Sequence, residues 1–244
     1  MTDRRATEMT GMPWPESAPE FAVCNFALGD FINNLPRQLT VEGRIHAETL
    51  LAASGAVAGY AAQQALLAEI SQDAAALRRH GLQIVQTKAG DECYFGDALN
   101  ARLFAQKSED AHQRLWPLVA RAAVTCGLAP EALPKLEPMF AHVSRVVGSE
   151  AEGFPSLAEA RPHLPAKELL KFVWPLALGC FNGELSAKVL QPAMAVPHRW
   201  RPAIAAIAAN TFIRQVKSVL APDKAVIVVF ESAIYASKPK LQLG

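Results

Sequence analysis

A run of small and apolar residues from Thr49 to Ala68 constrains the fold of this chain more than any other segment. It contains no Asp, Glu, Lys or Arg, and alanine is its commonest residue. Alanine favours a helix because it loses no side-chain rotamer freedom there. The sequence therefore predicts a long helix from about Val41, capped by Thr40, to at least Ile70.

Two glycines within this run, Gly55 and Gly59, stand four residues apart. They therefore share one face of the predicted helix. Because a glycine costs up to about 1 kcal/mol relative to alanine inside a helix, the pair predicts a close backbone contact that compensates. The contacting element is either another helix of the same chain, which we favour, or a helix of a second copy.

The same run has the length of a membrane span but not its composition. Ser54, Tyr60 and Gln63 lower its apolar density below that of a spanning helix. No apolar segment follows the arginines near the N-terminus, as it would in a secretory signal. The four cysteines form no Cys-x-x-Cys pair. We therefore expect a soluble, cytoplasmic protein without a membrane partner.

Shorter segments also carry helix and strand signals. Ser17 and Glu20 have the spacing of a capping box, and apolar residues follow at helical intervals until Pro36. A second box, Ser156 and Glu159, lies in a polar connection. Two β-rich runs around a Gly-containing turn predict a hairpin. Further helices are predicted at about 166–180, 198–220 and 223–237. The last of these also fits a buried strand, and we favour the helix.

The composition narrows the fold class. Apolar residues make up 51% of the 244 residues, charged residues 19%, and the formal charge is +1. These values exclude a disordered chain and a nucleic-acid binder held mainly by phosphate contacts. We expect a mainly α, multi-helix globular domain around the central Ala/Gly-rich helix, with one small β-hairpin near residues 82–95. Residues 1–16 are expected to form a flexible N-terminal tail, and 17–244 a single helical domain.

Candidate metal ligands are few. Glu109 and His112 lie three apart on one predicted helix face, the spacing used by di-iron helical bundles. Such a site needs a second Glu-x-x-His pair, and the sequence has none, so an exposed first helical turn is the favoured interpretation. Glu42 and His46 are placed to touch. His46 and Glu48 lie two apart, on opposite sides of the predicted helix, and are expected not to share a metal.

A ligand site is predicted where the second strand of the hairpin meets the next helix. Free backbone N–H groups gather at such a helix start. Tyr94, Asp97 and Asn100 are the candidate ligand-binding residues, with Glu48 as a neighbour. The alternative is a well-capped junction in which Tyr94 packs on the core, and we favour it.

Other familiar sites are absent from the sequence. It contains no Gly-x-Ser-x-Gly, no P-loop and no dinucleotide-binding glycine motif, and no cofactor is evident. The basic cluster His198–Arg201 contains Trp200 and could stack on a base. One such cluster in a neutral chain is weak, so we expect it to begin a helix with Trp200 packed inward.

Two functional hypotheses from different classes follow. The first is a binding or assembly module that self-associates, as a homodimer, through alanine-rich helices. The second is an enzyme or small-ligand binder whose site is assembled between helices from Glu, His, Asp and Tyr side chains. Sequence alone does not decide between a catalytic and a non-catalytic protein.

Overall fold

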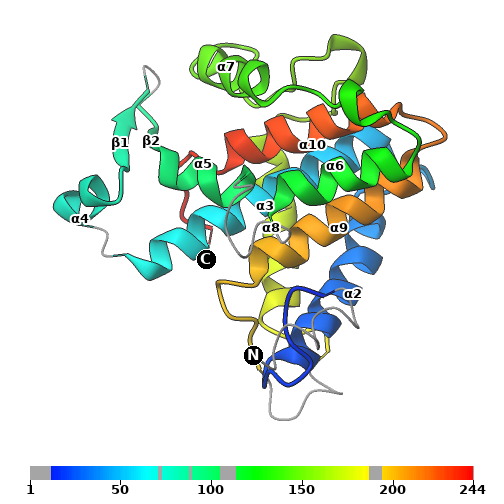
Figure 1. Cartoon of the computed structure of the whole chain (residues 1–244), viewed down its shortest axis with the longest axis horizontal. Coiled ribbons are helices and arrows are strands. Elements are labelled where there is room, and N and C mark those ends of the chain that lie inside the picture. The colour runs from blue at the N-terminus through cyan, green and yellow to red at the C-terminus, as the bar shows by residue number, and fades with distance from the viewer. Residues whose placement is uncertain (1–11, 71–72, 88–89, 105–113, 187–193, 244) are drawn as a thin grey trace.

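The computed structural model of the chain describes residues 12–70, 73–87, 90–104, 114–186 and 194–243. Within these residues the protein forms nine α-helices and one two-stranded antiparallel sheet, as Figure 1 shows. The helices are α2 (Phe21–Gln38), α3 (Ala47–Glu69), α4 (Ala74–Arg79), α5 (Asp97–Phe104), α6 (Leu115–Thr125), α7 (Leu136–Val146), α8 (Ala166–Phe181), α9 (Arg201–Val216) and α10 (Pro222–Ala236). The strands are β1 (Gln83–Gln86) and β2 (Glu92–Phe95). The predicted mainly α fold with one hairpin is confirmed.

The helix α3 forms the centre of the molecule. It packs most extensively against α10 and α9, and also against α8 and α5 (Figure 1). Nearly every side chain along it is buried. Among the described residues it is the one helix long and apolar enough to cross a membrane, and 94% of its apolar window is buried inside the protein. That burial is the environment expected of a core helix.

The two glycines of α3 face α10. A Cβ atom at Gly55 would overlap the carbonyl group of Val229, and one at Gly59 would overlap that of Ala233. The backbones of α3 and α10 therefore approach within a distance that no other residue type permits. The contact joins two helices of the same chain, which is the alternative that the sequence favoured.

The start of α3 differs from the predicted one. Residues 41–45 are not helical, because Val41 and Arg44 exchange two backbone hydrogen bonds across a tight turn. Glu42 and Gly43 take left-handed backbone conformations there, with φ of 50° and 74°. Such conformations are incompatible with a right-handed helix. The helix begins only after His46.

Neither predicted capping box forms. The Glu20 side chain makes no cap hydrogen bond to α2, and it contacts Arg199 and Trp200 instead. The backbone N–H of Ser156 donates to Glu231, and Glu159 pairs with Lys224. In both segments the acidic side chain binds a distant partner, which local spacing does not reveal.

Three further segments can be compared with what the sequence predicted. Residues 222–236 form the helix α10 rather than a strand. Pro36 lies inside the last turn of α2, which continues to Gln38 rather than ending earlier. In the expected N-terminal tail, residues 1–11 lie outside the described residues, but Trp14 is fully buried. Trp14 therefore packs on the rest of the protein, although it lies within the expected tail.

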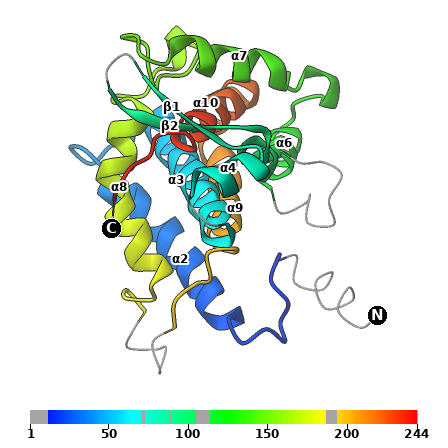
Figure 2. The same ribbon diagram turned by 90° about the vertical axis from the view of Figure 1, so that its left-hand side faces the viewer.

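The hairpin is held to the core by the C-terminal segment. The N–H of Tyr94 donates to the carbonyl of Lys238, and the N–H of Lys240 donates to that of Glu92. This segment lies beside β2, and Figure 2 shows the hairpin in front of α3 and α10. The side chain of Gln63, from α3, donates to the carbonyls of two residues of the segment. One edge of the hairpin is thus covered, while β1 forms the other.

Candidate functional site

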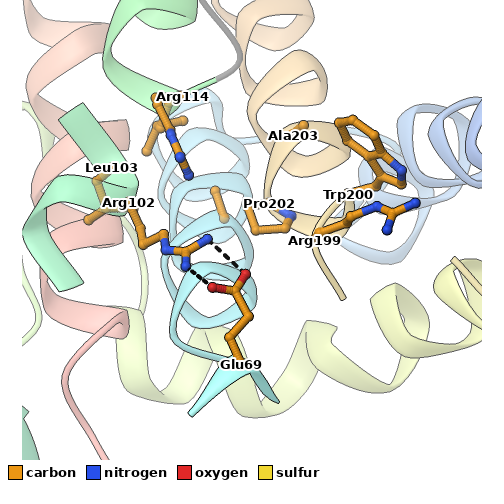
Figure 3. Close-up of a pocket in the computed structure, with 10 residues that line it drawn as sticks. Glu69, Arg102, Leu103, Arg114, Arg199, Trp200, Pro202 and Ala203 are labelled. Carbon is orange, nitrogen blue, oxygen red and sulfur yellow. Dashed lines mark hydrogen bonds and ion pairs between the residues drawn. The ribbon is translucent and has the colours of Figure 1, made fainter. Parts of the chain in front are cut away.

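A cavity of about 230 Å³ lies between α3, α5 and the N-terminal ends of α6 and α9. Its polar lining consists of three arginines, one glutamate and one tryptophan. Figure 3 shows these side chains around the space: Arg102 and Glu69 on one side, Trp200 on the other, and Arg114 extending toward the middle. The apolar lining is Ala58, Leu103, Leu115, Pro202 and Ala203.

On one side of the cavity, Arg102 and Glu69 form a two-pronged ion pair. Nη1 of Arg102 donates to Oε1 of Glu69 at 3.1 Å, and Nη2 donates to Oε2. Arg102 lies on α5, and Glu69 is the last residue of α3. Helix packing between α3 and α5 therefore brings together two side chains that are 33 residues apart in sequence.

On the other side, Arg199 and Trp200 precede α9 and are fixed by Glu20. The Glu20 carboxylate accepts hydrogen bonds from the Arg199 guanidinium and from Nε1 of Trp200. The pKa of Glu20 is lowered, first by a hydrogen bond from its own backbone and then by these two side chains. The ring of Trp200 also meets that of Trp14 edge to face, with centroids 6.3 Å apart. Trp200 is thus held in place from two directions.

The lining places guanidinium groups beside an apolar wall. Among its arginines, Arg102 pairs with Glu69, and Arg199 pairs with Glu20 outside the lining. Guanidinium groups bind carboxylates and phosphates through paired N–H donors. Apolar side chains beside them cover the uncharged part of an organic molecule. The arrangement is suited to holding a small organic anion.

The predicted ligand-binding residues do not line this cavity. Tyr94 is buried in a small apolar cluster near the end of α3. Asp97 lies in the first turn of α5, and the Oδ1 of Asn100 is buried with no hydrogen-bond partner among the described residues. Glu48 lies in the first turn of α3, at the opposite end of that helix from the cluster that holds Tyr94. The structure therefore does not bring Glu48 to the other three.

The predicted metal ligands Glu109 and His112 lie outside the described residues. The expectation that His46 and Glu48 point apart is wrong, since Nε2 of His46 lies 3.2 Å from Oε2 of Glu48. His46 precedes the helix in an extended conformation, so helical angles do not apply to the pair. The ring of His46 stacks on the ring of His163, with the two ring centroids 4.0 Å apart. Burial lowers the pKa of His46 and is the largest influence on it. The charge of Glu48 raises this pKa, and the charge of His163 lowers it.

No metal-binding group emerges from these contacts. Across the described ranges, the structure contains no set of three His, Cys, Asp or Glu side chains arranged to hold a metal ion. Glu42, expected to touch His46, lies in the turn that precedes α3. The histidine pair therefore contributes to packing at the start of α3.

Two residues of the cavity lining, Arg199 and Trp200, belong to the basic cluster noted in the sequence, which was expected to begin a helix with Trp200 packed inward. Glu69, Arg102 and Arg114 stand in no motif and meet only through helix packing, so the sequence did not point to them. No known family model matches this chain, and no curated protein or solved structure proved similar to it.

Proposed function

We propose that this protein binds a small organic anion in the cavity between α3, α5, α6 and α9. One observation carries the proposal: three arginines from separate parts of the chain line a cavity of about 230 Å³ whose other walls are largely apolar. Paired N–H donors beside apolar side chains are the chemistry that holds an organic anion. This supports the small-ligand hypothesis drawn from the sequence over a protein without a ligand.

Thermal unfolding in the presence of organic anions and of inorganic phosphate tests the proposal. A ligand at about 100 times its Kd adds about 2.7 kcal/mol of stability, which for a chain of this size raises Tm by roughly 5–10 °C. Arg114→Gln and Arg102→Gln should each reduce that rise. Arg145→Gln, which changes an exposed arginine on α7, should leave it unchanged. Equal shifts in all three variants, or none in the wild type, would contradict the proposal.

Self-association as a homodimer is a second function that we propose, by a different route from the alanine-rich helices. Because α10 covers the glycine face of α3, that face is not free for a second copy. The observation that favours self-association is the outer edge of β1, which pairs with nothing in the described part of the chain. Its Ile84 and Val85 side chains are 39% and 40% exposed.

The register identifies which backbone groups face outward. Tyr94 donates to Lys238 on the far side of β2, and Ile84 is its partner in the hairpin. In an antiparallel pair both backbone groups of a residue point the same way, so those of Ile84 face the free edge. An uncharged, unblocked edge pairs readily with another strand. Light scattering after gel filtration should give the mass of a dimer, and Val85→Lys should give that of a monomer. A wild-type monomer at micromolar concentration would exclude this second function.

A further inference from the structure

We infer that the ligand is a short-chain organic carboxylate, and that its carboxylate displaces that of Glu69 from Arg102 when it binds. The inference rests on the proposed function and names the chemistry of its ligand. It depends on three features of the cavity: the geometry of the Arg102–Glu69 pair, the location of Glu69, and the apolar wall opposite.

The geometry of the pair is that of a bound carboxylate. Both oxygens of Glu69 accept from the two terminal nitrogens of Arg102, which is the parallel, two-bond arrangement that a guanidinium makes with a planar carboxylate. A ligand carboxylate in the same position would make the same two bonds. Figure 3 shows that this pair borders the cavity.

The location of Glu69 makes it an anion that is easily displaced. It is the last residue of α3, where the helix dipole disfavours negative charge. Its side chain is 48% exposed, so water can solvate the carboxylate once it leaves Arg102. Ion pairs at such exposed positions contribute little net stability. Displacement of Glu69 by a ligand therefore costs little.

The wall of the cavity selects an organic ligand over an inorganic one. Five of its ten lining residues are aliphatic or proline, namely Ala58, Leu103, Leu115, Pro202 and Ala203. Inorganic phosphate would pair with the guanidinium groups and leave that wall in contact with water. A short alkyl chain would cover it. The volume of about 230 Å³ lies below the range of about 300–1,000 Å³ typical of drug-sized ligands, which limits the chain length.

Isothermal titration calorimetry with acetate, butyrate, hexanoate and inorganic phosphate tests the inference. We expect affinity to rise by up to about fourfold per added CH₂ until the cavity is full, and phosphate to bind more weakly than hexanoate. Glu69→Gln should bind hexanoate about two- to fivefold more tightly, the range for loss of an exposed ion pair. The matched control is Glu168→Gln, which removes the equally exposed partner of Lys171 on α8 and should leave the affinity unchanged.

The outcomes separate this inference from the proposed function. If neither the wild type nor Glu69→Gln binds any of the four anions, both are overturned. If the wild type binds carboxylates and Glu69→Gln binds them no more tightly, the inference that the ligand displaces Glu69 is wrong, while the proposed function stands. If phosphate binds as tightly as hexanoate, the ligand class is wrong. Circular dichroism of each variant establishes that it is folded before titration.

Discussion

The backbone of Gly55 in α3 lies directly against the carbonyl group of Val229 in α10, leaving no space for a side chain. Gly59 repeats the contact one turn later, against Ala233. The interface between the two central helices therefore depends on the absence of two Cβ atoms. Close packing of this kind does not require a membrane, although small residues four apart are well known from membrane helices.

We expect Gly55→Ala to destabilise the protein by about 1–3 kcal/mol, because the added methyl group must push α10 away. Chemical denaturation with urea measures the change. The matched control is Gly29→Ala in α2, where an added Cβ would meet no atom within 4 Å. That substitution should stabilise the protein by about 0.5–1 kcal/mol, since alanine is the better helix former. Equal effects at the two positions would show that the contact between α3 and α10 is absent in solution.

Lys238 should make the stability of the protein depend on pH in the alkaline range. Its side chain is 3% exposed and lies over the ring of Phe95. Burial lowers its pKa from 10.5 to about 8. Between these values the unfolded chain holds a proton that the folded chain has lost, so the contribution of Lys238 to stability rises as the pH increases from about 8 to 10.5. Buried thiols such as that of Cys93, whose pKa burial raises, contribute with the opposite sign, so the comparison with a variant at position 238 isolates the lysine.

The substitution Lys238→Met should remove that contribution and stabilise the protein at pH 7 by about 3–3.5 kcal/mol, at about 1.4 kcal/mol per pKa unit. Denaturation curves between pH 7 and 10.5 compare the two proteins over the relevant window. Lys240→Met is the control, because Lys240 is exposed and paired with Glu92, and it should retain the slope of the wild type. A wild-type slope in Lys238→Met would mean that the amine is solvated in the folded protein.

Glu231 should produce a pH dependence of opposite sign. It is buried in α10, where its carboxylate accepts from the N–H of Ser156 at 2.5 Å and lies 4.0 Å from Nε2 of His142. Burial raises its pKa. The folded protein therefore keeps this proton to a higher pH than the unfolded chain, and stability falls as the pH rises through that interval.

Glu231→Gln should abolish this decrease, because the amide is neutral at every pH and its oxygen still accepts from Ser156. Glu231→Ala should instead destabilise the protein by about 1–3 kcal/mol, since it removes the hydrogen bond to the N–H of Ser156 and truncates a buried side chain. Denaturation between pH 4 and 8 distinguishes the two variants. A pH profile unchanged in Glu231→Gln would show that another group controls stability in this interval.

The sequence predicted the parts of the fold that depend on local composition. The run around Gly55 and Gly59 indicated a buried central helix, and the two β-rich runs indicated the hairpin. The start of α3 was misplaced because the turn at Glu42 and Gly43 breaks the helix without a proline. Local spacing also suggested a capping role for Glu20, whereas its carboxylate binds Arg199, 179 residues away.

The candidate site was harder to predict because its residues come from separate elements. Arg102 and Glu69 are 33 residues apart, and neither belongs to a motif. Only the packing of α5 on α3 brings them together, and a single sequence does not reveal which helices pack. Trp200 was noticed because it stands next to Arg199 in the chain. A site assembled from isolated residues has no such signal.

Trp14 connects the N-terminal segment to the stability of the domain and to the cavity. It is fully buried and packs edge to face on Trp200, which lines the cavity. Trp14→Ala should destabilise the protein by about 3–5 kcal/mol, the range for truncation of a buried aromatic residue. Because Trp200 loses one of its two supports, the same variant should bind hexanoate more weakly at a temperature where it remains folded. Trp14→Phe keeps an aromatic ring against Trp200 and should retain most of both properties. Urea denaturation and calorimetry measure the two effects separately, and a Trp14→Ala protein as stable as the wild type would place this residue in a free tail after all.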